Sequence, residues 1–134
     1  MKKCLFICFA IISIILLAGC TQKESYSLKL PDKGNITEVV LIGGEEKKSI
    51  KDKENVDFLI SQLSSINKKS GESVNDTPQE EKYYTIEFET TDGTSGDTLY
   101  IYETADGCFA EQPYNGISSI DKEQYQAIIN IFYK

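Results

Sequence analysis

The sequence predicts an α+β fold, in which an antiparallel β-sheet of about five to six strands carries two helices packed on one face. Residues 82–90 and 97–103 alternate apolar and polar side chains, which is typical of strands with one buried face. Residues 52–66 and 121–132 instead repeat apolar side chains at helical spacing. The 134 residues and the short links between strands favour one domain with antiparallel neighbours.

The predicted order of elements is β-β-β-α-β-β-β-α. Turn residues such as Pro31, Gly34, Gly43 and Gly44 separate the early strands, and Gly107 follows a later one. Residues 68–81 are polar and include glycine and proline, so we expect an exposed loop there. Strands are expected at residues 26–30, 36–42, 47–50, 82–90, 97–103 and 108–112.

Both predicted helices begin at an aspartate. Asp52 and Asp121 each stand where a side chain can accept a hydrogen bond from the first helical turn, and Gln124 completes a capping box after Asp121. The buried stripes are expected at Val56, Leu59, Ile60 and Leu63 in the first helix and at Tyr125, Ile128, Ile129 and Phe132 in the second.

An apolar segment precedes Cys20 and follows Lys2 and Lys3. Its end, Leu17-Ala18-Gly19-Cys20, resembles the lipobox of bacterial lipoprotein precursors, which are cut before the cysteine that then carries lipid. The resemblance implies a signal peptide at residues 1–19, a lipidated Cys20 with a flexible tether to residue 27, and one extracytoplasmic domain at residues 28–134. The alternative is a transmembrane anchor that stays attached, but the apolar segment is short for a bilayer span.

The composition excludes several classes of function. Lys2 and Lys3 carry the only charges in residues 1–19, so the net charge of −7 becomes −9 once that segment is removed. Such an acidic surface is a poor direct partner for nucleic acid and for anionic lipid headgroups. Neither histidine nor arginine is present, and Cys108 is the only cysteine after Cys20. We therefore expect no metal site, no cofactor and no disulfide framework. Cys108 is expected to be a buried thiol, and an intermolecular disulfide is the alternative.

The acidic residues suggest no catalytic pair. Glu87, Glu89, Glu103 and Glu111 alternate with apolar residues, so we expect them to point into solvent rather than to face each other across a cleft. Residues 92–97 contain two aspartates but lack the ligand spacing of a calcium loop, and their glycines favour a hairpin loop. No catalytic residue is predicted.

Tyrosine is the residue type that could mark a binding surface. Tyr83, Tyr100 and Tyr102 fall on the strand face opposite Ile86 and Leu99. If the helices cover the latter face, these tyrosines form a patch on the open face, with Tyr114 at its edge. Two alternatives need no ligand: the face is ordinary sheet surface with cross-strand tyrosine pairs, or the long loop covers it.

The segment Glu111-Gln112-Pro113-Tyr114-Asn115-Gly116-Ile117, with the preceding strands and the last helix, resembles small lipoproteins of Gram-positive bacteria that share a domain of unknown function. The resemblance covers residue 36 to the C-terminus and implies no established activity or catalytic residues. Its Pro-Tyr-Asn-Gly segment is expected to form a rigid turn in which Asn-Gly takes positive φ.

These observations predict a non-enzymatic binding or accessory module, attached by a lipid anchor at Cys20 to the outer face of the cytoplasmic membrane. A protein or glycan of the cell envelope is the expected partner. The alternatives are an envelope hydrolase that uses paired carboxylates and a structural partner of another membrane protein.

Overall fold

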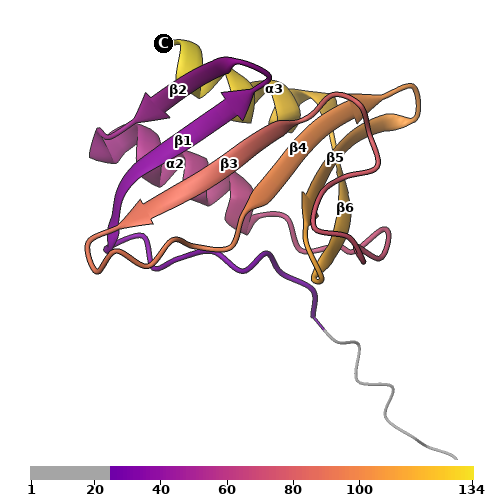
Figure 1. The fold of residues 1–134 in the computed structure, drawn as a ribbon, viewed down its shortest axis with the longest axis horizontal. Coiled ribbons are helices and arrows are strands. Elements are labelled where there is room, and N and C mark those ends of the chain that lie inside the picture. The colour runs from indigo at the N-terminus through magenta and orange to yellow at the C-terminus, as the bar shows by residue number, and fades with distance from the viewer. Residues whose placement is uncertain (1–24) are drawn as a thin grey trace, which may run out of the picture.

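The computed structural model describes residues 25–134, which form a six-stranded antiparallel sheet with two helices (Figure 1). The strand order across the sheet is β2-β1-β3-β4-β5-β6. This is the predicted α+β class, while residues 1–24, including the predicted signal peptide and Cys20, lie outside the described residues. The elements are β1 (Ile36–Gly43), β2 (Glu46–Ile50), α2 (Lys53–Ser64), β3 (Tyr84–Thr90), β4 (Leu99–Thr104), β5 (Gly107–Gln112), β6 (Gly116–Ile120), α3 (Lys122–Asn130) and a 3-10 turn η1 (Ile131–Tyr133).

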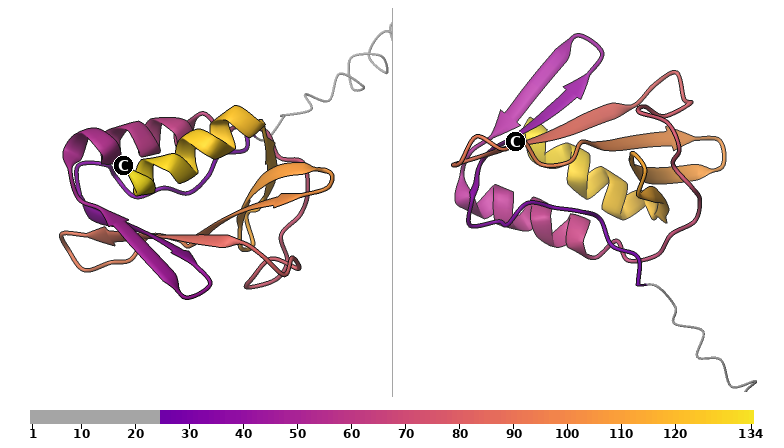
Figure 2. Two further views of the ribbon diagram at one scale, coloured as in Figure 1. Left: turned by 90° about the horizontal axis from the view of Figure 1, so that it is seen from above. Right: turned by 60° about the horizontal axis from the view of Figure 1, so that its bottom comes forward.

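Both helices lie in one layer on one face of the sheet (Figure 2). Asp52 accepts a hydrogen bond from the Asn55 backbone N–H at 2.9 Å, and Asp121 accepts one from the Gln124 backbone N–H at 2.6 Å, so both predicted N-caps are confirmed. The predicted capping box is wrong, because the Gln124 side chain donates to the Gln62 carbonyl at 2.9 Å and to the Ser65 hydroxyl at 2.8 Å, at the end of α2. The two predicted stripes are buried against alternate residues of the strands. The sheet side of this core comprises Val39, Leu41, Ile86, Phe88, Leu99, Ile101, Cys108, Ala110 and Ile120.

The predicted strand at residues 26–30 is wrong. This segment belongs to no strand, because its backbone hydrogen-bonds to a side chain instead of to a neighbouring strand. Gln112 accepts a hydrogen bond from the Lys29 backbone N–H at 2.8 Å and donates one to the Lys29 carbonyl at 2.9 Å. The amide of Gln112 is itself buried, so the segment crosses the end of the sheet without joining it.

The structure instead adds a strand that the sequence analysis did not predict, β6. Its sequence, Gly-Ile-Ser-Ser-Ile, has too few β-branched or aromatic residues to stand out. It forms because β5 offers a free edge after a tight turn, and Cys108 pairs with Ile120 while Gln112 pairs with Gly116. The observed order is therefore β-β-α-β-β-β-β-α.

The strand directions give the domain two distinct ends. Gly43 of β1, Tyr84 of β3 and Thr104 of β4 come to one end of the sheet, and Ile36 and Gln112 come to the other. The chain enters from residue 25 at the latter end (Figure 1). We call this the tether end, and the opposite one the groove end. Within residues 25–134, neither helix is long and apolar enough to cross a membrane.

Candidate functional site

The expected open tyrosine face does not exist at Tyr100 and Tyr102. Both side chains project away from the helices as predicted, yet they are only 8% and 6% exposed. The loop between α2 and β3 crosses to this face of the sheet and covers them. The Tyr100 hydroxyl donates to the Asp76 backbone carbonyl at 3.0 Å, and Pro78 in the same loop is buried. As predicted, the loop contains no helix or strand and most of its residues are exposed, but Ser73 and Pro78 are buried and hold it against this face.

Glu111 is also buried, in contrast to the solvated position that was expected for it. Its two carboxylate oxygens accept hydrogen bonds from Ser73 at 2.7 Å and from Tyr102 at 2.9 Å. Burial of the ring, followed by the hydrogen bond to the Glu111 carboxylate, raises the pKa of Tyr102 above its usual range. Glu87, Glu89 and Glu103 are exposed, as predicted. Glu111 thus holds the loop to the sheet and faces no cleft.

Tyr114 remains highly exposed, at 68%, and lies at the tether end. Its φ of 57° is in the left-handed region, and Gly116 has a φ of 151°, so positive φ falls on these residues and not on Asn115. The Tyr114 hydroxyl donates to the Asp76 carboxylate at 2.7 Å. The Pro113 turn therefore displays an aromatic ring beside the covering loop, separate from the buried Tyr100 and Tyr102.

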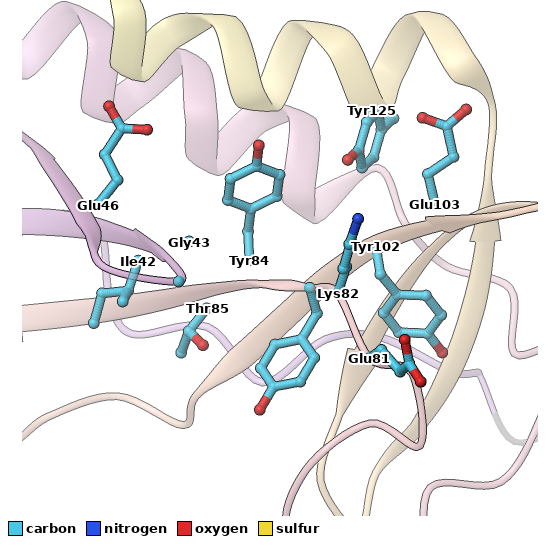
Figure 3. A pocket seen from close by; sticks show the side chains of 12 residues that line it. Ile42, Gly43, Glu46, Glu81, Lys82, Tyr84, Thr85, Tyr102, Glu103 and Tyr125 are labelled. Carbon is cyan, nitrogen blue, oxygen red and sulfur yellow. The ribbon is translucent and has the colours of Figure 1, made fainter.

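The candidate site is a groove of about 700 Å³ at the groove end of the domain. The β1–β2 turn, the start of β3, the end of β4 and one residue of α3 form its walls. Tyr84 and Tyr125 lie on the helix side of the sheet, and Tyr102 lies on the other side (Figure 3). Gly43 is required here because a Cβ atom would approach the Tyr84 ring to 2.5 Å.

Tyr83 is the one predicted binding residue that lies in the groove with substantial exposure. It is half-buried, and its ring meets the Tyr100 ring edge-on with a centroid separation of 5.2 Å and an interplanar angle of 79°. Tyr102 lines the same groove, but its hydroxyl is already bonded to Glu111. Tyr100 and Tyr114 do not line it. The four predicted tyrosines therefore divide between the groove, the covered face and the tether end.

Three of the four tyrosines that line the groove differ from all other tyrosines in the hydrogen bonding of their hydroxyl groups. All eight tyrosines of the chain lie in the described part. Five of their hydroxyls donate to carbonyl or carboxylate oxygens: those of Tyr26, Tyr100, Tyr102, Tyr114 and Tyr133. Within residues 25–134, the hydroxyls of Tyr83, Tyr84 and Tyr125 make no such bond, and all three residues line the groove. The groove thus holds three aromatic rings whose polar tips are available to a ligand.

The charged groups around the groove are partly paired. Glu103 forms an ion pair with Lys122, whose ammonium also lies 5.5 Å from the centroid of the Tyr125 ring. The Oε1 atom of Glu46 lies 3.4 Å from the Nζ atom of Lys48. Glu81 and Lys82 contribute one charge of each sign, and in the described part of the chain neither makes an ion pair. The groove can therefore offer both a donor and an acceptor beside its aromatic walls.

Sequence reasoning missed Tyr84 and Tyr125 as site residues. The alternation of β3 assigned Tyr84 to the core face, and the helical stripe assigned Tyr125 to the core. Both assignments are correct, because each ring packs against the core at its inner edge. Only the pairing of Tyr84 with Ile101 places this end of β3 beside the end of β4 and below α3, and that placement depends on tertiary structure.

The remaining candidates carry no chemistry in the structure. Cys108 is buried and free, and burial raises the pKa of its thiol. Asp92 accepts hydrogen bonds from Thr90 and Thr94 at the β3–β4 loop, which hold its pKa at about 2. Across residues 25–134, no three acidic or cysteine side chains gather in an arrangement that could hold a metal ion. Cys20 lies outside the described residues.

The fold defines the chain as a small α+β domain with a single-layered antiparallel sheet and one helical layer. It belongs to the DUF5301 family, described as "Domain of unknown function (DUF5300)", whose model matches residues 24–119. The matched part includes β1 to β5, α2 and all of β6 except its last residue, Ile120.

Among solved structures, the chain is similar to one described as "NMR structure of the protein from Ruminococcus gnavus". The two are 25% identical, with a TM-score of 0.61, over 73% of this chain and 98% of that one. No curated protein shows significant similarity to the chain.

Proposed function

We propose that the protein is a lipoprotein, held by Cys20 on the outer face of the cytoplasmic membrane, whose groove binds a protein or glycan partner in the cell envelope. The observation that carries the binding role is the convergence of Tyr83, Tyr84 and Tyr125, with unbonded hydroxyls, on one groove. Aromatic rings that combine apolar area with a polar tip are typical of recognition surfaces. The residues before Cys20 support the anchor.

The position of the groove supports the same proposal. The chain enters the domain at the tether end (Figure 1), so a lipid at Cys20 would attach to the end opposite the groove. A ligand in the envelope can then reach the tyrosines without competing with the membrane for the same surface. A non-enzymatic module fits this arrangement.

The paired-carboxylate hydrolase is less well supported. Glu46, Glu81 and Glu103 all line the groove, but all three are exposed. Glu103 is paired with Lys122, and Glu46 is paired with Lys48. A general acid needs a carboxyl that burial keeps protonated. Among residues 25–134, the only buried acid is Glu111, and hydroxyl groups of Ser73 and Tyr102 occupy its oxygens.

The anchor is tested by the substitution Cys20→Ala in the native host. The variant should accumulate as an uncut precursor or appear in the medium, because the lipid acceptor is gone. Wild-type protein should fractionate with membranes at the mature mass. A variant that still does so would contradict the lipoprotein assignment.

The binding role is tested by cross-linking in intact cells, followed by capture of the protein. Tyr83→Ser removes a groove ring and should abolish the cross-linked partner, whereas Phe58→Ser removes an exposed ring of α2 outside the groove and should leave that partner in place. Melting temperatures of both variants verify that they are folded. Equal capture by the wild type and Tyr83→Ser would show that the groove is not the binding site.

A further inference from the structure

The tether end carries the most exposed apolar side chains in the described part of the chain. Val74 is 69% exposed and Tyr114 is 68% exposed, and the two belong to segments joined by the hydrogen bond from Tyr114 to Asp76. The left-handed φ of Tyr114 is unfavourable for a residue with a side chain. The fold thus holds an aromatic ring in solvent at a cost in backbone strain, which is typical of functional positions.

The entering chain is fixed beside this ring. The Asn115 side chain donates to the Ser27 carbonyl at 3.0 Å, and the Tyr26 hydroxyl donates to the Gly116 carbonyl at 3.4 Å. Cys20 lies five positions before Ser25, and five residues span at most about 18 Å. A lipid at Cys20 therefore keeps residue 25, at the end of the domain that carries the Tyr114 turn, within about 18 Å of the lipid attachment point.

Charge favours the same orientation. Lys68 and Lys69 lie at the tether end, because the Ser70 and Gly71 backbone N–H groups donate to the Ile117 carbonyl at 2.7 and 3.1 Å. These lysines match the nearby acids, Glu72 and Asp76, in number. Residues 25–134 together carry a net charge of −9, so the excess of acid lies elsewhere on the domain. An anionic bilayer repels that remainder more strongly than it repels the tether end.

We propose that the tether-end surface, formed by Lys68, Lys69, Val74 and Tyr114, contacts the phospholipid headgroup layer and orients the domain with its groove outward. The inference rests on the lipid anchor of the proposed function. Tyrosine is enriched at the membrane interface because its ring is apolar and its hydroxyl is polar. Lys69 forms an ion pair with Glu72 at 2.7 Å, but Lys68 makes no ion pair with residues 25–134 and can reach a lipid phosphate. The tether restricts the domain to the bilayer, so even a weak surface contact suffices to set its orientation.

The chain contains no tryptophan, so a single tryptophan can report on each end of the domain. The mature chain, residues 20–134, is coupled through Cys20 to a maleimide lipid in vesicles of equal parts phosphatidylcholine and phosphatidylglycerol, with brominated lipid as quencher. Buried Cys108 does not compete for the coupling. One variant carries Tyr114→Trp. The matched control carries Tyr133→Trp, since Tyr133 is also exposed and bonded to a carboxylate, that of Glu46, but near the groove end.

Fluorescence of the Tyr114→Trp protein should be quenched at least about twofold more than that of the Tyr133→Trp protein, because only the former meets the headgroup layer. Val74→Trp gives a second reporter on the same surface if Tyr114→Trp does not fold. Equal quenching at both ends, or none at Tyr114→Trp and Val74→Trp, would overturn the membrane-contact surface. Chemical coupling makes this result independent of lipidation in the cell, which the Cys20→Ala fractionation decides separately.

Discussion

The two ends of this domain use the same residue types in opposite ways. At the tether end, the polar groups of three distant segments bond to one another: Gln112 to Lys29, Asn115 to Ser27, and Tyr114 to Asp76. At the groove end, the tyrosine hydroxyls of the groove walls make no hydrogen bonds to residues 25–134, apart from that of Tyr102. Polar groups that bond internally stabilise the fold, and those left free at a concave surface are available to a ligand.

Close packing follows the same division. Gly116 lies where Lys69, Tyr26 and the Gly71 carbonyl all approach within about 3 Å of the position of a Cβ atom. Gly43, at the other end, is approached only by the Tyr84 ring. The tether end is therefore a junction of three segments, and the groove end is made of strand termini around a hollow. The contacts that stabilise the fold and the surface accessible to a ligand therefore lie at opposite ends of one sheet.

The largest effect is expected for Gln112→Ala. The substitution removes both hydrogen bonds to the Lys29 backbone from a side chain that is 1% exposed, and it leaves two backbone groups unpaired. The free energy of unfolding should fall by about 3 kcal/mol. Lys82→Ala at the groove end is the control and should change it by less than about 0.5 kcal/mol. Urea denaturation measures both, and equal losses would remove the contrast in stability between the two ends.

A smaller, pH-dependent effect is expected from the groove side. Burial, followed by the nearby Tyr84 and Glu103, raises the pKa of Tyr125 to about 12. An unfolded tyrosine ionises near pH 10, so folding favours the neutral form. The stabilisation is complete below about pH 10 and is lost as the pH rises towards about 12, by about 2 kcal/mol.

The comparison for this effect is between wild-type protein and Tyr125→Phe, which has no proton to lose at that position. Denaturation series from pH 9 to pH 12 should show a steeper loss in the wild type, while Tyr100 and Tyr102 titrate in both proteins. Parallel curves would mean that folding does not disfavour the ionised form of Tyr125, which would contradict the burial of its ring in the groove wall.

The sequence is sufficient to predict most of the fold, because the core repeats with a regular period. Val56 to Leu63 and Tyr125 to Phe132 face the sheet as their spacing indicates, and Ile86, Phe88, Leu99 and Ile101 face the helices. The prediction of a strand at residues 26–30 was wrong. Apolar alternation does not reveal whether a side chain such as that of Gln112 will make the backbone hydrogen bonds that a neighbouring strand would otherwise make. Strand β6 was missed because its serines have little strand preference.

The candidate site was less predictable, since it depends on where a loop and several strand ends meet. The spacing of Tyr100 and Tyr102 correctly gives their face, but no local pattern shows that residues 65–83 cover it. Glu111 has the same alternation as the solvated Glu87, and only the position of Ser73 distinguishes them. Of the groove tyrosines, Tyr83 could be recognised because it lies off the core face. Tyr84 and Tyr125 could not, because core packing fully accounts for their pattern.

The central claim is that ligand binds at the groove end, while the tether end is free of it. The most direct test is an NMR titration of ¹⁵N-labelled mature protein, without its lipid, with soluble fragments of the cell wall. The account predicts shift changes at the backbone amides of Gly43, Tyr83, Tyr84 and Tyr125 and none at Val74 and Tyr114. Shift changes confined to Val74 and Tyr114, or absent from the groove amides, would contradict it.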